Sequence, residues 1–113
     1  RWGARFKTNR QQKAYIGIQK LQQSYVADTI LEELSAATTK LTETEQQVKT
    51  ARENMALAEE NLDLVTFSYN EGKASMVDVL SAQLSWTQAQ TNLINAHLAA
   101  KMAVAEYRKA ISE

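Results

Sequence analysis

The apolar positions between Ile30 and Tyr69 recur in steps that alternate between four and three residues. An average spacing of 3.5 residues is the period of a left-handed coiled-coil seam, in which one face of a helix packs against another helix. The seam consists of Ile30, Leu34, Ala37, Leu41, Thr44, Val48, Ala51, Met55, Ala58, Leu62, Val65 and Tyr69, of which only Thr44 is polar. The pattern therefore predicts one long helix with a continuous packed face.

Upstream of Ile30 the seam decays, and the start of this helix has to be inferred from capping signals. Thr8 is followed three residues later by Gln11, which is the spacing of a capping box, so we expect the helix to begin near Thr8 or Asn9. A helix over about residues 9–70 would be about 90 Å long at 1.5 Å per residue. Gly17 costs about 1 kcal/mol relative to alanine inside a helix, so we expect a kink, fraying or a close neighbour there.

The stretch "SYNEGKASMVDVL", residues 68–80, predicts the end of this helix and the start of another. Gly72 suits the left-handed conformation that closes a helix C-terminus. Ser75 and Asp78 have the spacing of a capping box, with aspartate in place of the usual glutamate. A bend over about residues 71–75 is so short that the flanking helices must be antiparallel neighbours.

The returning helix, over about residues 76–112, has a seam of its own. It consists of Val79, Ala82, Trp86, Ala89, Leu93, Ala96, Ala100, Ala103, Tyr107 and Ala110, again in steps of three and four. Alanine recurs at every seventh residue from Ala82 to Ala110, and such a column lets two helix backbones approach closely. The predicted fold is an all-α, long antiparallel helical hairpin that occupies the whole chain, residues 1–113, as one domain.

A second apolar stripe follows a different side of the returning helix. Its members are Val77, Leu80, Leu84, Ile94, Leu98 and Ala105, interrupted by Thr87, Thr91 and Lys101. A helix with two apolar faces needs neighbours on two sides, which a lone hairpin does not supply. The returning helix also leaves residues of about 9–30 unpaired, so we expect self-association as an antiparallel or side-by-side dimer.

Composition narrows the possible functions. Thirteen basic residues balance thirteen acidic ones, so no global charge favours nucleic acid, and we expect no nucleic-acid partner. The first thirteen residues contain five basic residues and no acidic one, which indicates solvated charge rather than a phosphate or lipid site. The sequence contains no cysteine, which excludes disulfides and thiolate metal sites, and no apolar run approaches the roughly 20 residues of a membrane-spanning helix.

The sequence gives little support for catalysis. His97 is the only histidine, and we interpret it as a solvated or partly packed helix residue rather than a general base. Glu59, Glu60 and Asp63 are interpreted as a charged outer face rather than a metal site. We therefore expect no enzyme activity, cofactor or metal. Asp78 has two compatible interpretations: it caps a helix, and it places charge at the tip of the hairpin.

Residues of about 51–111 resemble the C-terminal helical hairpin of the TolC-like outer-membrane efflux proteins. The segment reads "ARENMALAEENLDLVTFSYNEGKASMVDVLSAQLSWTQAQTNLINAHLAAKMAVAEYRKAI". It matches a pattern of Asn-Leu, Tyr-x-x-Gly, Asp-Val-Leu-x-Ala-Gln, repeated alanines and a late tyrosine. Residues 9–50 fit by periodicity only, and "WGARFK" weakly resembles the residues that follow a barrel strand in that family.

The resemblance implies a homotrimeric channel with a β-barrel in the outer membrane of a Gram-negative bacterium and a helical duct in the periplasm. This chain would be a soluble excerpt of that duct and of a larger protein. The channel would be a passive conduit for drugs or exported substrates, with a periplasmic adaptor (membrane fusion) protein and an inner-membrane pump as partners.

The resemblance also implies roles for residues at the bend, which would form the periplasmic entrance of the duct. Tyr69 would tether the closed entrance, and Asp78 would contribute to an acidic constriction ring. Ser81 differs from family members that have a second aspartate, and Ala74 from members with an arginine, which indicates a weaker or differently latched gate. The adaptor would dock on Gly72, Lys73, Ala74 and Ser75.

A second function class stays open at this point. The hairpin could be a structural coiled-coil module that mediates assembly only, with the bend as a generic cap. A preceding signal peptide, a homologous hairpin and alternating strands of about 10 residues in the parent sequence would favour the channel.

Overall fold

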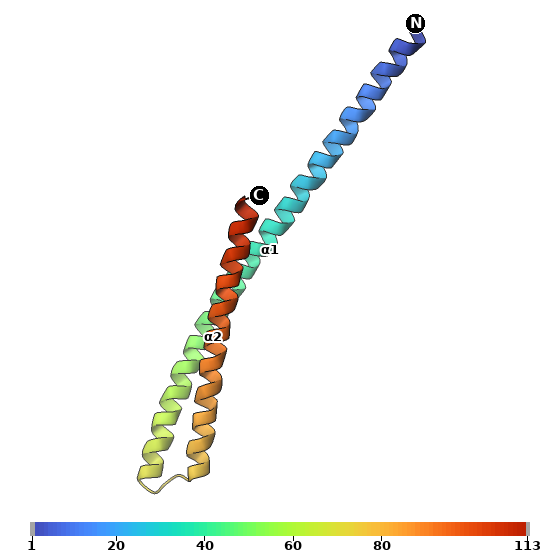
Figure 1. Cartoon of the computed structure of the whole chain (residues 1–113). Coiled ribbons are helices and arrows are strands. Elements are labelled where there is room, and N and C mark those ends of the chain that lie inside the picture. Colours follow the sequence, from blue (N-terminus) through green and yellow to red (C-terminus); the bar gives the residue numbers. More distant parts are fainter. Residues whose placement is uncertain (1, 113) are drawn as a thin grey trace.

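The computed structural model describes the backbone of residues 2–112 and the side chains of residues 8–112. This part of the chain forms two helices, α1 (Trp2–Asn70) and α2 (Met76–Ser112), joined by a short bend. The helices run antiparallel and make a rod of 105 × 20 × 13 Å with the bend at one end (Figure 1). The predicted all-α helical hairpin is confirmed.

The start of α1 differs from the prediction. We expected the helix to begin near Thr8 or Asn9, but it is already helical at Trp2 and passes through Thr8 and Gly17 without interruption. The capping-box interpretation of Thr8 and Gln11 is wrong, because a residue with helix on both sides has no free helix terminus to cap. A Cβ at Gly17 would meet nothing within 4 Å, so no other described part of the chain approaches this glycine closely.

The two predicted seams face each other and form the core of the contact between α1 and α2. From Leu34 to Val65 each α1 seam residue is buried or half-buried, and so is each α2 seam residue from Val79 to Ala110. The two ends of the α1 seam, Ile30 and Tyr69, remain 37% and 39% exposed because they lie at or beyond the limits of the pairing.

The alanine column on α2 produces the tightest packing in the hairpin. Ala103 is 1% exposed, Ala82 4% and Ala89 8%, whereas the larger Trp86 and Leu93 in the alternate layer are half-buried. A methyl side chain is covered completely when two helix backbones approach each other, but a large side chain at a two-helix seam extends past its edge. The column is not covered evenly, because Ala96 and Ala110 are only half-buried.

Thr44 is the single polar residue of the α1 seam, and it is 2% exposed. Its hydroxyl donates to the carbonyl oxygen of Lys40 at 2.8 Å and lies 3.1 Å from that of Leu41. Burial of a hydroxyl without a partner would be costly, but here the helix itself supplies the acceptors. No buried side-chain nitrogen or oxygen in the described residues lacks a hydrogen-bond partner.

α2 ends well before α1 does, so the N-terminal part of α1 has no neighbour (Figure 1). The C-terminal turn of α2 lies beside α1 near residues 33–40, where Glu33, Lys40, Glu106 and Lys109 line a common surface hollow. Each residue from 8 to 28 is exposed. This unpaired segment, residues 8–32, is called the overhang below, and its existence agrees with the prediction from the unequal lengths of the helices.

Candidate functional site

The bend at the tip of the rod is closed by a Schellman motif centred on Gly72. The backbone N–H of Lys73 donates to the carbonyl of Ser68 at 2.8 Å, and that of Gly72 donates to Tyr69 at 2.9 Å. This pairing requires a left-handed residue, and Gly72 has φ of 77°. Glycine takes this conformation without the steric conflict of a Cβ, which explains why the long helix ends here.

The start of α2 is closed by the predicted capping box. The backbone N–H of Ser75 donates to Oδ2 of Asp78 at 2.9 Å, and the N–H of Asp78 donates to Oγ of Ser75 at 3.2 Å. Both bonds satisfy donors that a helix N-terminus leaves unpaired. The bond from the Ser75 backbone, followed by that from its side chain, holds the pKa of Asp78 below its usual value of 3.8. Asp78 is therefore ionised at neutral pH.

The predicted site residues lie together at this tip. Tyr69, Gly72, Lys73, Ser75, Asp78 and Ser81 are exposed, and Ala74 is half-buried. Tyr69 belongs to the last turn of α1, and Asp78 and Ser81 belong to the first turns of α2. The tip therefore presents a turn of backbone, one lysine and two carboxylates, Glu71 and Asp78, to the surroundings, which suits recognition of another surface.

An apolar rim surrounds the bend, and only part of it was predicted from the sequence. The rim consists of Leu64, Phe67, Met76, Val77 and Leu80, which are 63%, 63%, 48%, 73% and 56% exposed. Val77 and Leu80 belong to the predicted second stripe of α2, but Leu64, Phe67 and Met76 were missed. Leu64 and Phe67 lie off the α1 seam, three residues apart, and this spacing is the signal that could have identified them.

The other residues considered as catalytic or metal-binding candidates lie along the rod, away from the tip. His97 is half-buried in the middle of α2, while Glu59, Glu60 and Asp63 are exposed on α1. No group of three histidine, cysteine, aspartate or glutamate side chains in the described residues is placed to hold a metal ion. We therefore interpret these four residues as ordinary residues of the helix surface.

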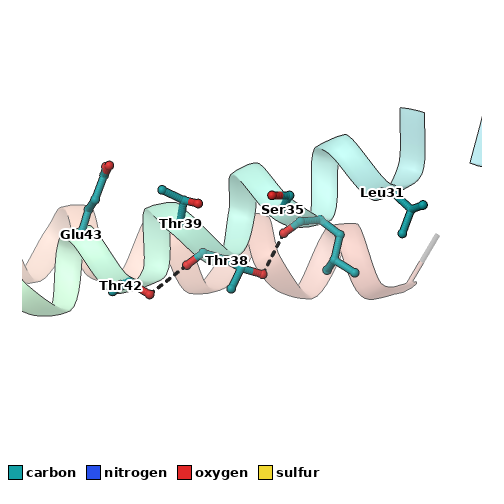
Figure 2. A pocket seen from close by; sticks show the side chains of 7 residues that line it. Leu31, Ser35, Thr38, Thr39, Thr42 and Glu43 are labelled. Carbon is teal, nitrogen blue, oxygen red and sulfur yellow. Dashed lines mark hydrogen bonds between the residues drawn. The ribbon is translucent and has the colours of Figure 1, made fainter. Parts of the chain in front are cut away.

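A shallow hollow lies along α1 where α2 ends, and Figure 2 shows the side chains that line it, from Leu31 to Glu43. The hydroxyl of Thr38 donates to the carbonyl of Leu34 at 2.8 Å, and that of Thr42 donates to the carbonyl of Thr38 at 3.2 Å. Because these hydroxyls already donate to their own helix, the hollow offers few donors to a ligand. It is a helix surface rather than a binding site.

Neither α1 nor α2 contains a stretch, within the described residues, of the length and hydropathy that crossing a membrane requires. No family model, curated protein or solved structure matches the chain. The functional interpretation rests on the residues themselves: a glycine-closed tip, a capped carboxylate, and apolar side chains that neither helix of the hairpin covers.

Proposed function

We propose that this chain is a segment of the wall of a periplasmic α-helical duct in a TolC-like outer-membrane efflux channel. In this proposal the hairpin is one of several that stand side by side in the duct wall, and each such hairpin is called a stave. Its bend lies at the entrance, where an adaptor protein docks. The resemblance of residues 51–111 to that family and the long two-helix shape both support the proposal. The channel would conduct drugs or exported substrates passively.

The observation that carries the proposal is the uncovered second stripe of α2. Val77, Leu84 and Ile94 are 73%, 71% and 62% exposed, although α2 packs against α1 over its whole length through another face. Large exposed apolar side chains gathered along one side of a helix indicate an interaction surface, even though Thr87, Thr91 and Lys101 interrupt the row. In a duct wall each helix contacts a neighbour on either side, so a helix with two apolar faces is suited to that position.

The tip has properties that fit an entrance. Several copies of the hairpin arranged around an axis would bring their Asp78 carboxylates toward one another, and these groups are ionised at neutral pH. A ring of carboxylates favours cations, as in other channels. The apolar rim around Gly72 would give an adaptor protein a surface on which to dock.

The experiment is an efflux assay in the bacterium that makes this chain. Deletion of its gene should increase accumulation of a fluorescent efflux substrate, and the wild-type gene should restore export. Leu84→Glu should fail to restore it, because a charge would be buried between staves. Ser85→Glu adds the same charge at the next exposed residue, off the stripe, and should restore export.

A structural role in assembly is the second candidate, and the uncovered overhang favours it because that segment also needs a partner. Under this alternative, deletion would leave substrate accumulation unchanged while a larger complex that contains the chain falls apart. Unchanged accumulation would reject the duct proposal. Restoration of export by Leu84→Glu would reject the stave contact on which it rests.

A further inference from the structure

The hairpin has two broad faces, one on each side of the seam. When the seam residues of a coiled coil are labelled a and d, positions e and g flank the seam on its two sides. Because α1 and α2 are antiparallel, the g residues of both helices lie on one broad face and the e residues of both lie on the other. Gln47 and Asn54 of α1 and Asn92 of α2 are g residues, and they line one common hollow.

The face that contains these three residues is called the amide face below. It consists of Gln47, Asn54 and Asn61 of α1 and Gln88, Asn92 and Asn95 of α2, and all six side chains are exposed. In the paired part of the hairpin, residues 44–70 of α1 and 79–105 of α2, no charged residue lies on this face. Side-chain amides donate and accept hydrogen bonds without carrying charge, so this face binds water but holds no fixed ion.

The opposite face carries charge, and it is called the charged face below. Glu45, Arg52 and Glu59 of α1 recur there seven residues apart at the e position, and all three are exposed. The other charged residues of the paired part lie farther round the helices, on that side or along the outer edges: Lys49, Glu53, Glu60, Asp63 and Lys101. The charges of the hairpin are thus segregated from the amide face.

We propose that the amide face lines the lumen of the duct and that the charged face is turned outward. This inference rests on the proposed function and names the surface along which the substrates pass. Rings of charged side chains make a pore selective for charge. A lumen lined by neutral amides therefore passes cationic, anionic and uncharged solutes alike, and selection by charge is confined to the tip.

The curvature of a duct wall favours this orientation. Copies of one hairpin around an axis bring identical residues closer together on the concave side than on the convex side. Identical charges repel, so Glu45, Arg52 and Glu59 turned inward would each form an unfavourable ring of like charge. On the convex side the same charges diverge and are screened by salt over about 8 Å. Amides on the concave side avoid the repulsion altogether.

The position of Asp78 agrees with this orientation. Asp78 lies 14 residues, or two heptads, before Asn92, and therefore on the amide side of α2. The ring of carboxylates proposed for the entrance requires Asp78 to face the axis of the duct. The orientation that turns Asp78 inward turns the amide face inward as well.

The test converts amides to carboxylates of nearly the same shape on each face. Asn54→Asp combined with Asn92→Asp adds two negative charges to the amide face, and an aspartate at position 92 can still accept the bond that Gln88 donates at 3.0 Å. Gln83→Glu combined with Gln90→Glu adds the same charge to the charged face. Gln83 and Gln90 are a matched control because they are exposed e residues of α2, seven residues apart.

Export of an anionic and of a cationic fluorescent substrate is measured in cells that lack the gene and carry each variant. The amide-face pair should lower anionic relative to cationic export by about threefold or more, because carboxylates in the lumen repel anions. The control pair should leave the ratio unchanged. An unchanged ratio with the amide-face pair, or an equal change with the control pair, would overturn the inference.

Ser85 lies on the same side of α2 as Asn92, seven residues before it. A charge beside a water-filled passage biases the passage without closing it. Ser85→Glu should therefore still restore export of a cationic substrate, as its use in the efflux assay requires, and should lower export of an anionic one.

Thiol labelling gives a second readout that does not depend on charge. The sequence contains no cysteine, so one introduced cysteine is the only thiol of this chain. Asn54→Cys treated with a bulky uncharged maleimide should export both substrates more slowly, whereas Arg52→Cys, two residues away on the charged face, should not. The unsubstituted channel receives the same treatment as a control. Slower export through Arg52→Cys alone, or through neither variant, would overturn the assigned face.

Failure of this inference is distinguishable from failure of the proposed function. If deletion of the gene leaves substrate accumulation unchanged, the duct proposal is rejected and this inference with it. If deletion raises accumulation but the amide-face pair leaves the export ratio unchanged, the duct proposal stands and only the assigned face is wrong.

Discussion

Gly17 and Gly72 are both glycines, but one continues a helix and the other ends it. Gly17 lies inside α1 with ordinary helical geometry, whereas Gly72 has φ of 77° and ends the helix. Neither has an atom within 4 Å of a Cβ position, so space does not distinguish them. Backbone conformation alone decides what a side chain would cost at each site.

Replacement of each glycine by alanine should therefore have opposite effects. Gly72→Ala should destabilise the hairpin by about 1–2 kcal/mol, because an L-residue is strained in the left-handed conformation. Gly17→Ala should raise helix content, since alanine is favoured over glycine in a helix by about 1 kcal/mol. Urea unfolding and far-UV circular dichroism of the two variants at low concentration measure both effects. Equal effects of the same sign would contradict the assigned conformations.

Asp78 should make the stability of the tip depend on pH. Its pKa is lowered in the folded chain by its bonds with Ser75, so its contribution is present above the unfolded value of 3.8 and is lost as the pH falls through the lower folded value. Asp78→Ala should therefore lower the melting temperature at pH 7 and make almost no difference near ~pH 2.

The control for this prediction is Asp63→Ala, which removes an exposed carboxylate in the interior of α1, away from any helix end. Its effect at pH 7 should be small, because it breaks no cap. A deficit of Asp78→Ala that persists unchanged to pH 2 would show that the carboxylate does not act through the cap.

Each helix has a seam that packs and an outer face that does not. Thus Ala103 and Ala105 are two residues apart on α2, but Ala103 is 1% exposed and Ala105 faces outward. The alanine column sets how closely α1 and α2 approach, so a larger side chain there forces the helices apart.

Replacement of these two alanines by leucine should affect stability differently. Ala103→Leu should destabilise the hairpin by about 1–3 kcal/mol through overpacking. Ala105→Leu introduces the same side chain on the outer face and should change stability by no more than about 0.5 kcal/mol. Urea unfolding of both variants gives the two values. A tolerated leucine at position 103 would mean that the seam is looser than the structure has it.

Most of the element structure could be predicted from the sequence, because helix period, the Gly72 stop and the Ser75–Asp78 cap depend on residues within a few positions of one another. The start of α1 could not, since the motif at Thr8 and Gln11 has the form of a cap in any context. Whether it caps depends on the conformation of the residues before it, and these are helical.

The whole molecule is a slender rod with a radius of gyration of 28.9 Å. A rod of this shape has no interior, so each segment is stabilised only by the helix beside it. Most helical stability in proteins comes from tertiary packing, and the overhang has no such neighbour in the described residues. The stability of α1 must therefore differ along its length.

Hydrogen exchange should reveal this difference. At concentrations where the chain is monomeric, amides of residues 8–28 should exchange much faster than those of residues 40–65, because the first group opens without breaking contacts to α2. Uniform protection along α1 in the monomer would contradict the structure.

The sequence by itself determined that this protein is two helices with a glycine turn between them, because periodicity, caps and φ preferences act over a few residues. It also predicted the unpaired N-terminal part of α1 and the second apolar stripe of α2. Only the tertiary structure decided that apolar residues of α1 near the bend remain uncovered. Leu64 and Phe67 are exposed because α2 folds back along another face of α1. Burial depends on where the second helix lies, and that position is a property of the folded chain.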